Sequence, residues 1–141
     1  LENVFMKIPL LNKMVGFVDD DIEDCDFLIF VLVNPKDYKE AVRNAWILVA
    51  PHHGRESGYN NDFVYLVNPY LTIISDTTKG ETSVTEKYTS KSQGWGVWKQ
   101  GEYTPTERKC LTTRNDGNVE VVFGESDDPS YSGTLRVTIG V

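Results

Sequence analysis

Apolar residues follow two patterns along the chain. In its first part they form short unbroken runs, "FLIFVLV" over 27–33, "ILVA" over 47–50 and "LTIIS" over 71–75. Runs of branched apolar residues without polar alternation are typical of strands that are covered on both faces. We therefore predict that these three segments are strands of one sheet.

A helix is predicted between the first two runs. Asn34 is a good helix cap, and Pro35 fits the first helical position. The segment "PKDYKEAVRNAW" over 35–46 then has a single apolar stripe at helical spacing, which indicates that the helix packs on a face of the sheet. The stripe consists of Tyr38, Ala41, Val42 and Ala45.

Two shorter helices are predicted further along the chain. The first covers "NDFVYLV" over 61–67 and can be capped by Asn60 or Asn61. The second covers "SVTEKYTS", where Ser83 and Glu86 have the spacing of a capping box.

From residue 94 onward, apolar residues alternate with small or polar ones. "RKCLTTR" and "NVEVVF" flank "NDG", whose residues tolerate positive φ, so we predict an antiparallel hairpin. "GTLRVTI" over 133–139 predicts a last strand. We expect a single domain over 1–141, with an irregular lead-in over 1–26, an α/β part over 27–93 and a β-rich part over 94–141.

Composition and charge narrow the range of partners. The 141 residues include 14 Lys and Arg against 21 Asp and Glu, a formal net charge of -7. This balance argues against nucleic-acid binding through the whole surface, although a local basic patch stays open. No run approaches the roughly 18 apolar residues that a membrane helix needs, and no signal-peptide pattern is visible. We therefore expect a cytoplasmic protein without a membrane segment.

The only two histidines of the chain are adjacent. His52 and His53 follow the run over 47–50, where Pro51 stiffens the strand exit and Gly54 permits a sharp turn. Sites in layered α/β folds collect at the carboxyl ends of strands, so we expect this loop to border an open cleft. Imidazole is a common zinc ligand and a general base. The alternative is a pair of loop histidines with ordinary hydrogen bonds.

Four stretches carry a family resemblance. "ILVAPHHGRES", "FVYLVNP", "LTIIS" and "KCLTTRNDGNVEV" follow one another in this order. Over roughly 27–123 the chain resembles the metallo-β-lactamase-fold hydrolases of the ComEC-like group, most specifically around His52. The resemblance implies a layered α/β fold. The chain would be half or a remnant of a four-layer αββα sandwich, with a carboxy-terminal antiparallel β hairpin region.

The same resemblance implies a metal site, usually with two zinc ions, at one edge of the paired sheets. It makes His52 and His53 candidate metal ligands, with His52 as the expected ligand and His53 as its supporting partner. It also makes His53 and Arg55 candidate catalytic residues, which would contact the substrate or its leaving group. The implied substrates are phosphodiesters, including nucleic acid.

The chain departs from the family pattern at two places. The family's His-X-His-X-Asp-His motif is absent, and Asn34 stands where the family has an Asp that bridges the metals. We therefore expect a zinc-dependent hydrolase or a fragment of one, inactive without the rest of its site. The alternative is a degenerate, non-catalytic binding or assembly module. Half a sandwich exposes an apolar sheet face, so a partner half or a second copy of the chain is expected.

Overall fold

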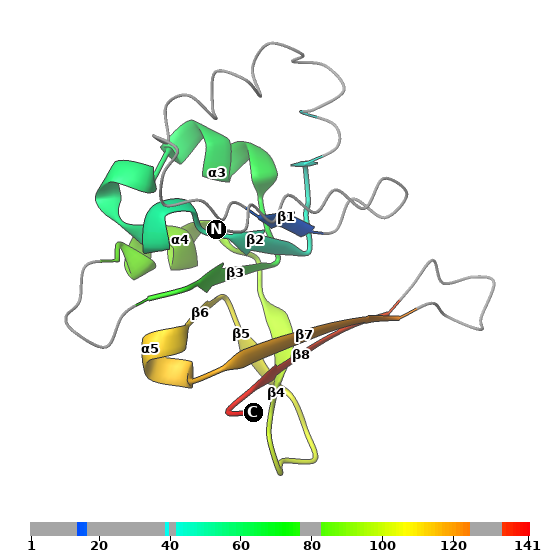
Figure 1. Ribbon diagram of the computed structural model, residues 1–141. Coiled ribbons are helices and arrows are strands. Elements are labelled where there is room, and N and C mark those ends of the chain that lie inside the picture. The colour runs from blue at the N-terminus through cyan, green and yellow to red at the C-terminus, as the bar shows by residue number, and fades with distance from the viewer. Residues whose placement is uncertain (1–13, 17–38, 40–41, 77–82, 125–133) are drawn as a thin grey trace.

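A computed structural model of the chain describes residues 14–16, 39, 42–76, 83–124 and 134–141. These residues form two sheets and a few short helices (Figure 1). The first sheet is parallel, with the strand order β1 (Met14–Gly16), β2 (Ile47–Val49), β3 (Leu71–Ile74) and β6 (Cys110–Thr112). The strands predicted over 47–50 and 71–75 are thus confirmed as neighbours in one sheet. The run over 27–33 lies outside the described residues.

The strands of the parallel sheet are largely apolar because both of its faces are covered. Along β2, Ile47 belongs to one core cluster and Leu48 to the other, and both are fully buried. Ile73 and Ile74 of β3 are divided between the two clusters in the same way. One cluster lies under the helices and the other lies between the sheets, which accounts for the unbroken runs.

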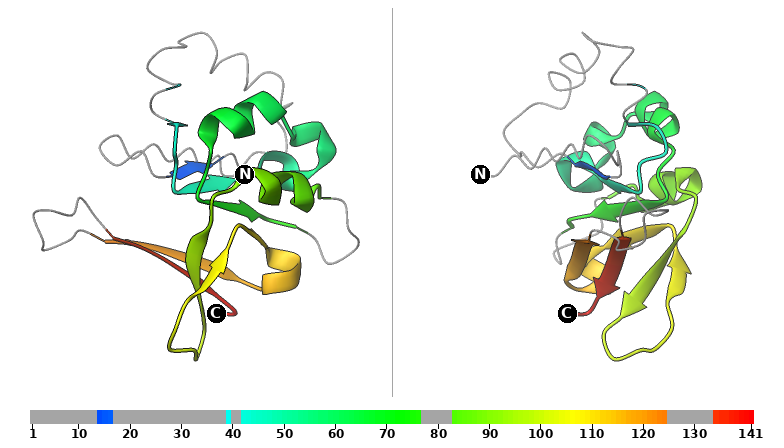
Figure 2. Two further views of the ribbon diagram at one scale, coloured as in Figure 1. Left: turned by 180° about the vertical axis from the view of Figure 1, so that it is seen from behind. Right: turned by 90° about the vertical axis from the view of Figure 1, so that its right-hand side faces the viewer.

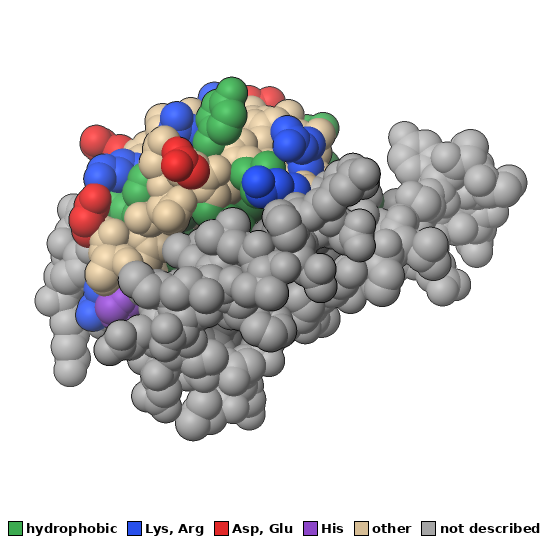
Figure 3. All heavy atoms as spheres, turned by 90° about the horizontal axis from the view of Figure 1, so that it is seen from above, with side chains coloured by type: hydrophobic (Ala, Val, Ile, Leu, Met, Phe, Trp, Pro, Cys, Tyr) green, Lys and Arg blue, Asp and Glu red, His purple; other side chains and the backbone are tan. Residues whose placement is uncertain are grey.

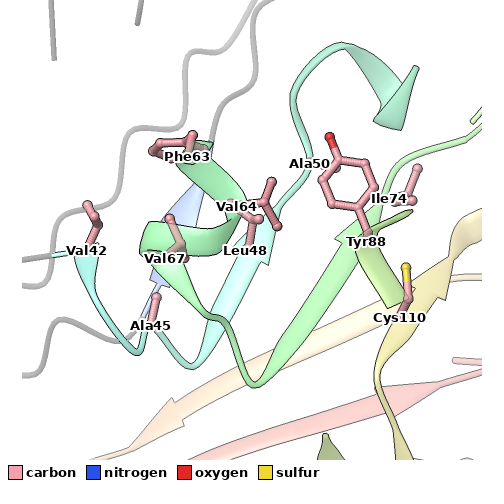
Figure 4. Packing of buried hydrophobic residues seen from close by; sticks show 10 residues of the cluster. All are labelled: Val42, Ala45, Leu48, Ala50, Phe63, Val64, Val67, Ile74, Tyr88 and Cys110. Atoms are coloured by element: carbon pink, nitrogen blue, oxygen red, sulfur yellow. The ribbon is translucent and has the colours of Figure 1, made fainter. Parts of the chain in front are cut away.

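Helices α3 (Asn61–Val67) and α4 (Thr85–Lys91) cover one face of the parallel sheet. The predicted cap of α3 is confirmed at Asn60, whose side-chain oxygen accepts a hydrogen bond from the Phe63 N–H at 2.8 Å. Figure 4 shows the cluster formed by the helices, the sheet and the residues before β2: Val42, Ala45, Leu48, Ala50, Phe63, Val64, Val67, Ile74, Tyr88 and Cys110.

The second sheet has the strand order β5 (Thr106–Arg108), β4 (Trp95–Lys99), β8 (Thr134–Ile139) and β7 (Val119–Gly124). β8 runs antiparallel to β7 and parallel to β4. Val97 and Val137 are paired in register and buried toward the first sheet. The alternating strand predicted over 133–139 is therefore confirmed as β8.

The chain is a mixed α/β structure in which the parallel sheet lies between a helical layer and the second sheet (Figure 2). Aromatic side chains join the two sheets at one end. The Trp46 ring stacks on Trp95 with centroids 5.6 Å apart, and Tyr70 meets Trp95 edge-on at 5.9 Å. The expected α/β fold class is therefore confirmed.

The hairpin predicted around "NDG" is wrong. β6 joins the parallel sheet beside β3, whereas β7 belongs to the second sheet. Between them lies α5 (Thr113–Asp116), capped by the Thr112 hydroxyl, which accepts from the Asn115 N–H at 3.2 Å. β6 is buried along its whole length, so it fits a sheet with two covered faces better than an edge hairpin. The antiparallel hairpin of this region is β7 with β8.

The helix predicted over 35–46 lies largely outside the described residues. Lys39 and Val42 are helical, but Asn44 has a left-handed φ of 55°. The predicted end at Trp46 is therefore wrong, because a left-handed residue cannot continue a right-handed helix. β1 also differs from expectation, since it forms a strand within a lead-in that is predicted to be irregular.

The predicted helix α4 is confirmed, but its capping box is not. The N-cap is Val84, which makes no side-chain cap, and the helix begins at Thr85. The Ser83 hydroxyl instead donates to an Asp76 carboxylate oxygen at 2.9 Å. Ser83 therefore bonds to a residue that follows β3 instead of capping its own helix.

Candidate functional site

The loops that follow three parallel strands meet at one edge of the first sheet. Parallel strands place their carboxyl ends together, which is where α/β folds hold their ligands. Here β2 leads into residues 51–58, the histidine loop, while β3 leads into Ser75 and Asp76 and β6 leads into Thr113. The histidines therefore lie at a strand end, as predicted. That they border an open cleft stays a prediction.

The backbone of the histidine loop is unusual. It consists of two short turns, η1 (Pro51–Gly54) and η2 (Glu56–Gly58). His52, His53 and Gly54 have φ values of 47°, 54° and 67°, so three consecutive residues lie in the left-handed region. For a residue with a side chain this costs about 1–2 kcal/mol. Backbone strain of this kind clusters at functional sites.

Two glycines allow this loop to pack closely. A Cβ on Gly54 would lie 2.8 Å from Cγ2 of Ile74, at the end of β3. A Cβ on Gly58 would lie 2.8 Å from the carbonyl oxygen of Pro51. Both distances are too short for van der Waals contact. The loop therefore folds back on itself and presses against the sheet, which fixes the backbone that carries the two histidines.

The His53 ring is anchored to the neighbouring strand end. Its Nδ1 lies 2.7 Å from the carbonyl oxygen of Ser75. A carbonyl oxygen can only accept, so Nδ1 carries the hydrogen and donates it. In the neutral ring the lone pair then resides on Nε2. This is the arrangement found in metal-ligating histidines, whose second nitrogen donates to a carboxylate or a backbone carbonyl.

The His52 ring is held within its own loop. Its Nδ1 lies 2.7 Å from the Ser57 hydroxyl oxygen. A hydroxyl can donate or accept, so this contact leaves both tautomers of His52 open. The two adjacent imidazoles are thus held by different partners, one by a hydroxyl side chain and the other by the backbone.

Helix α4 fixes the far side of the histidine loop. The Val84 N–H donates to the Gly54 carbonyl at 2.8 Å, and Arg55 forms an isolated β-bridge with Ser83. Glu56 forms a salt bridge with Lys87 of α4. Each hydrogen bond contributes roughly 0.5–1.5 kcal/mol, so a few of them offset the strain at the two histidines. Arg55, the predicted substrate contact, has an exposed side chain.

Asp76 is a site residue that the sequence analysis did not find. Its side chain is fully buried, directly after the strand end that anchors His53. The carboxylate accepts from the Ser83 hydroxyl at 2.9 Å and lies 3.5 Å from the Arg114 guanidinium, a distance that makes an ion pair. An acidic residue immediately after a buried parallel strand is the signal that could have revealed it.

A second buried carboxylate organises the turn after β6. Asp116 accepts from the Thr112 N–H at 2.9 Å and pairs with the Arg108 guanidinium at 2.9 Å. These contacts hold α5 at the end of the strand, so the "TTRND" segment forms a fixed corner of the same sheet edge. Thr113 and Arg114 project from this corner toward Asp76.

Cys110 does not belong to the site. It is a free, buried thiol in the cluster beneath the helices. Burial raises its pKa from 9.0 to about 12. A nucleophilic cysteine needs a lowered pKa, so Cys110 is a core residue.

The histidine loop carries two imidazoles, a kind of donor that zinc binds, at the sheet edge. Within the described ranges, no group of three or more His, Cys, Asp and Glu side chains could hold a metal ion. A catalytic zinc ion needs about three protein ligands and an open position. His53 makes the Nδ1–H bond that is common among histidine ligands.

In comparisons with known proteins, no protein-family model, no curated protein and no solved structure matched the chain. Within its described part, the chain has no helix that combines the length and apolar character needed to span a membrane. The functional argument therefore rests on the geometry of the sheet edge.

Proposed function

We propose that the chain is part of a zinc-dependent hydrolase of the metallo-β-lactamase type, in which the histidine loop supplies one imidazole ligand. The observation that carries the proposal is the hydrogen bond from His53 Nδ1 to the Ser75 carbonyl at 2.7 Å. This bond directs the lone pair to Nε2, the nitrogen through which the ring would then bind a metal. The strained loop and its position at the sheet edge support the same role.

This geometry favours a different order of roles from the one that the resemblance implies. His53 is the better ligand, and His52 is the supporting residue that Ser57 orients. Arg55 is exposed at the end of the same turn, where its charge can attract the anionic group of a phosphodiester. A bound zinc ion would supply Lewis acidity and activate water. The remaining ligands would come from outside this sequence, from a longer parent protein or from a partner chain.

The test is a zinc titration of the 141-residue chain, followed by the NMR signals of the two imidazoles. We expect weak binding, because two histidines are too few for a stable site. The His53 signals should shift more than those of His52, and His53→Ala should reduce zinc binding more than His52→Ala. Zinc binding that leaves both imidazoles unchanged would rule the proposal out.

A phosphodiesterase assay with added zinc or manganese completes this test. We expect no turnover by the 141-residue chain, and Asn34→Asp should not create any, because the other ligands are still missing. Tight stoichiometric zinc binding, or turnover that His53→Ala abolishes, would show that the ligand set is larger than two histidines.

The second candidate function is a degenerate binding or assembly module. Asn34 favours it, since the uncharged amide stands where the family has a bridging carboxylate. The outward face of the second sheet could then contact a partner half or a second copy of the chain, with Trp98 and Val122 partly exposed there. In this case, size measurements should detect an assembly that His52→Ala and His53→Ala leave unchanged.

A further inference from the structure

The peptide group between Ser75 and Asp76 is bonded at both ends. Its carbonyl oxygen accepts the His53 Nδ1–H at 2.7 Å. Its N–H donates to the Thr113 hydroxyl oxygen at 2.9 Å. His53 and Thr113, which follow different strands, therefore contact opposite ends of the same planar unit.

Thr113 makes a second bond that completes a clamp. Its hydroxyl donates to the Asp76 carbonyl oxygen at 3.0 Å, so one hydroxyl both accepts from and donates to the Asp76 backbone. This uses the normal capacity of a hydroxyl group. The Asp76 side chain is tied separately to Ser83 and Arg114. Neither the Ser75–Asp76 peptide group nor the Asp76 side chain can rotate without breaking one of these bonds.

From this geometry we infer that Thr113 is a positioning residue for His53. It holds the Ser75–Asp76 peptide group so that the carbonyl faces His53 Nδ1, and it thereby keeps the ring in the Nδ1–H tautomer. The hydrogen bond from the Asp76 N–H to Thr113 also polarises the same peptide group and strengthens its carbonyl as an acceptor. The value of this arrangement for metal binding rests on the proposed function, whereas the tautomer itself does not.

The tautomer is measurable without any metal. Long-range ¹H–¹⁵N NMR spectra distinguish the protonated ring nitrogen from the other one. With two histidines in the chain, His52→Gln assigns every signal. At about pH 8.5, well above the ordinary pKa of imidazole, we expect His53 to be mainly in the Nδ1–H form. A His53 ring that is mainly in the Nε2–H form in the unmodified chain would overturn the inference directly.

Thr113 variants test the positioning role. Thr113→Val keeps the shape and removes the hydroxyl, so the ratio of the Nδ1–H to the Nε2–H form should fall about two- to fivefold. Thr113→Ser keeps the hydroxyl and should retain the ratio of the unmodified chain. Thr138→Val on the outward face of the second sheet is the control and should also leave the ratio unchanged. The inference would be overturned by an unchanged ratio in folded Thr113→Val, or by a similar fall of the ratio in Thr113→Ser.

The zinc titration separates this inference from the proposed function. If zinc binds without shifting either imidazole signal but the tautomer responds as expected, Thr113 positions His53 and the metal proposal fails. If His53 binds zinc and the tautomer ignores Thr113, the metal proposal stands and the positioning role fails.

Discussion

The carboxyl edge of the parallel sheet and the second sheet are stabilised in different ways. At the edge, a buried carboxylate, a strained loop and a clamped peptide group meet, and each contact depends on a specific partner. In the second sheet, Val97 and Val137 face the core, while Trp98 and Arg136 lie on the outward face. At the end of β4, Lys99 forms an ion pair with Glu102 in which both side chains are exposed. Substitutions at the edge should therefore have larger effects than matched substitutions in the second sheet.

A pair of carboxylate deletions should show the largest difference. Asp76→Ala removes a fully buried side chain from its contacts with Arg114 and Ser83, and should lower the free energy of unfolding by about 3 kcal/mol. Glu102→Ala breaks the ion pair with Lys99, in which Nζ and Oε1 lie 3.9 Å apart and both side chains are at least half exposed. This substitution should change the free energy of unfolding by less than about 0.5 kcal/mol. Urea unfolding measures both values. Equal losses would contradict the division into two kinds of region.

Two glycines with positive φ provide the next comparison. Gly54→Ala creates a clash with Ile74 in addition to unfavourable φ, and should destabilise the fold by about 2–3 kcal/mol. Gly101, in the turn after β4, has a φ of 85° but no neighbouring atom within 4 Å of an added Cβ. Gly101→Ala should therefore show the φ effect alone, about 1 kcal/mol. Equal losses of stability in Gly54→Ala and Gly101→Ala would contradict the close approach of the histidine loop to Ile74.

The free energy of unfolding should depend on pH through the ionisation of the Cys110 thiol, which is buried in the parallel sheet. Burial raises its folded-state pKa from the ordinary value of 9.0 to about 12. Unfolded chains then ionise first as the pH rises, so the stabilising contribution is complete below pH 9 and is lost between about pH 9 and 12. At pH 10 the loss should be on the order of 1 kcal/mol. Cys110→Ala removes this part of the alkaline destabilisation, and an identical pH profile in that variant would contradict it.

The sequence predicted well the elements that depend on burial and local capping. β2 and β3 were recognisable because both faces of the parallel sheet are covered, and α3 because Asn60 caps it. The hairpin at "NDG" failed for a physical reason. A turn signal reports only local φ preference, whereas the fully buried β6 gains more by pairing with β3.

The site was predictable only in part. Two adjacent histidines after a buried strand identified the loop, since the carboxyl ends of strands collect functional groups. The contributions of Asp76 and Thr113 were not visible, because they follow β3 and β6, and these strands become neighbours only through the sheet order. The hydrogen bond that distinguishes His53 from His52 likewise joins residues that are 22 positions apart.

The smallest expected effect is the contact between Arg136 and Trp98 on the outward face of the second sheet. The Arg136 guanidinium carbon lies 4.3 Å from the centroid of the Trp98 ring. An exposed cation–π contact contributes roughly 0.5–1 kcal/mol. A double-mutant cycle with Arg136→Met and Trp98→Leu isolates this coupling energy from the other effects of each substitution.

The same kind of cycle on Asp76 and Arg114, with Asp76→Ala and Arg114→Met, gives the matched measurement at the sheet edge. Its coupling should be several times larger, because the Asp76 carboxylate is removed from water and the guanidinium is nearly so. Arg136→Lys keeps the positive charge and should retain part of the weaker coupling. If the coupling on the outward face equals or exceeds the one at the edge, then burial is not what distinguishes the two regions.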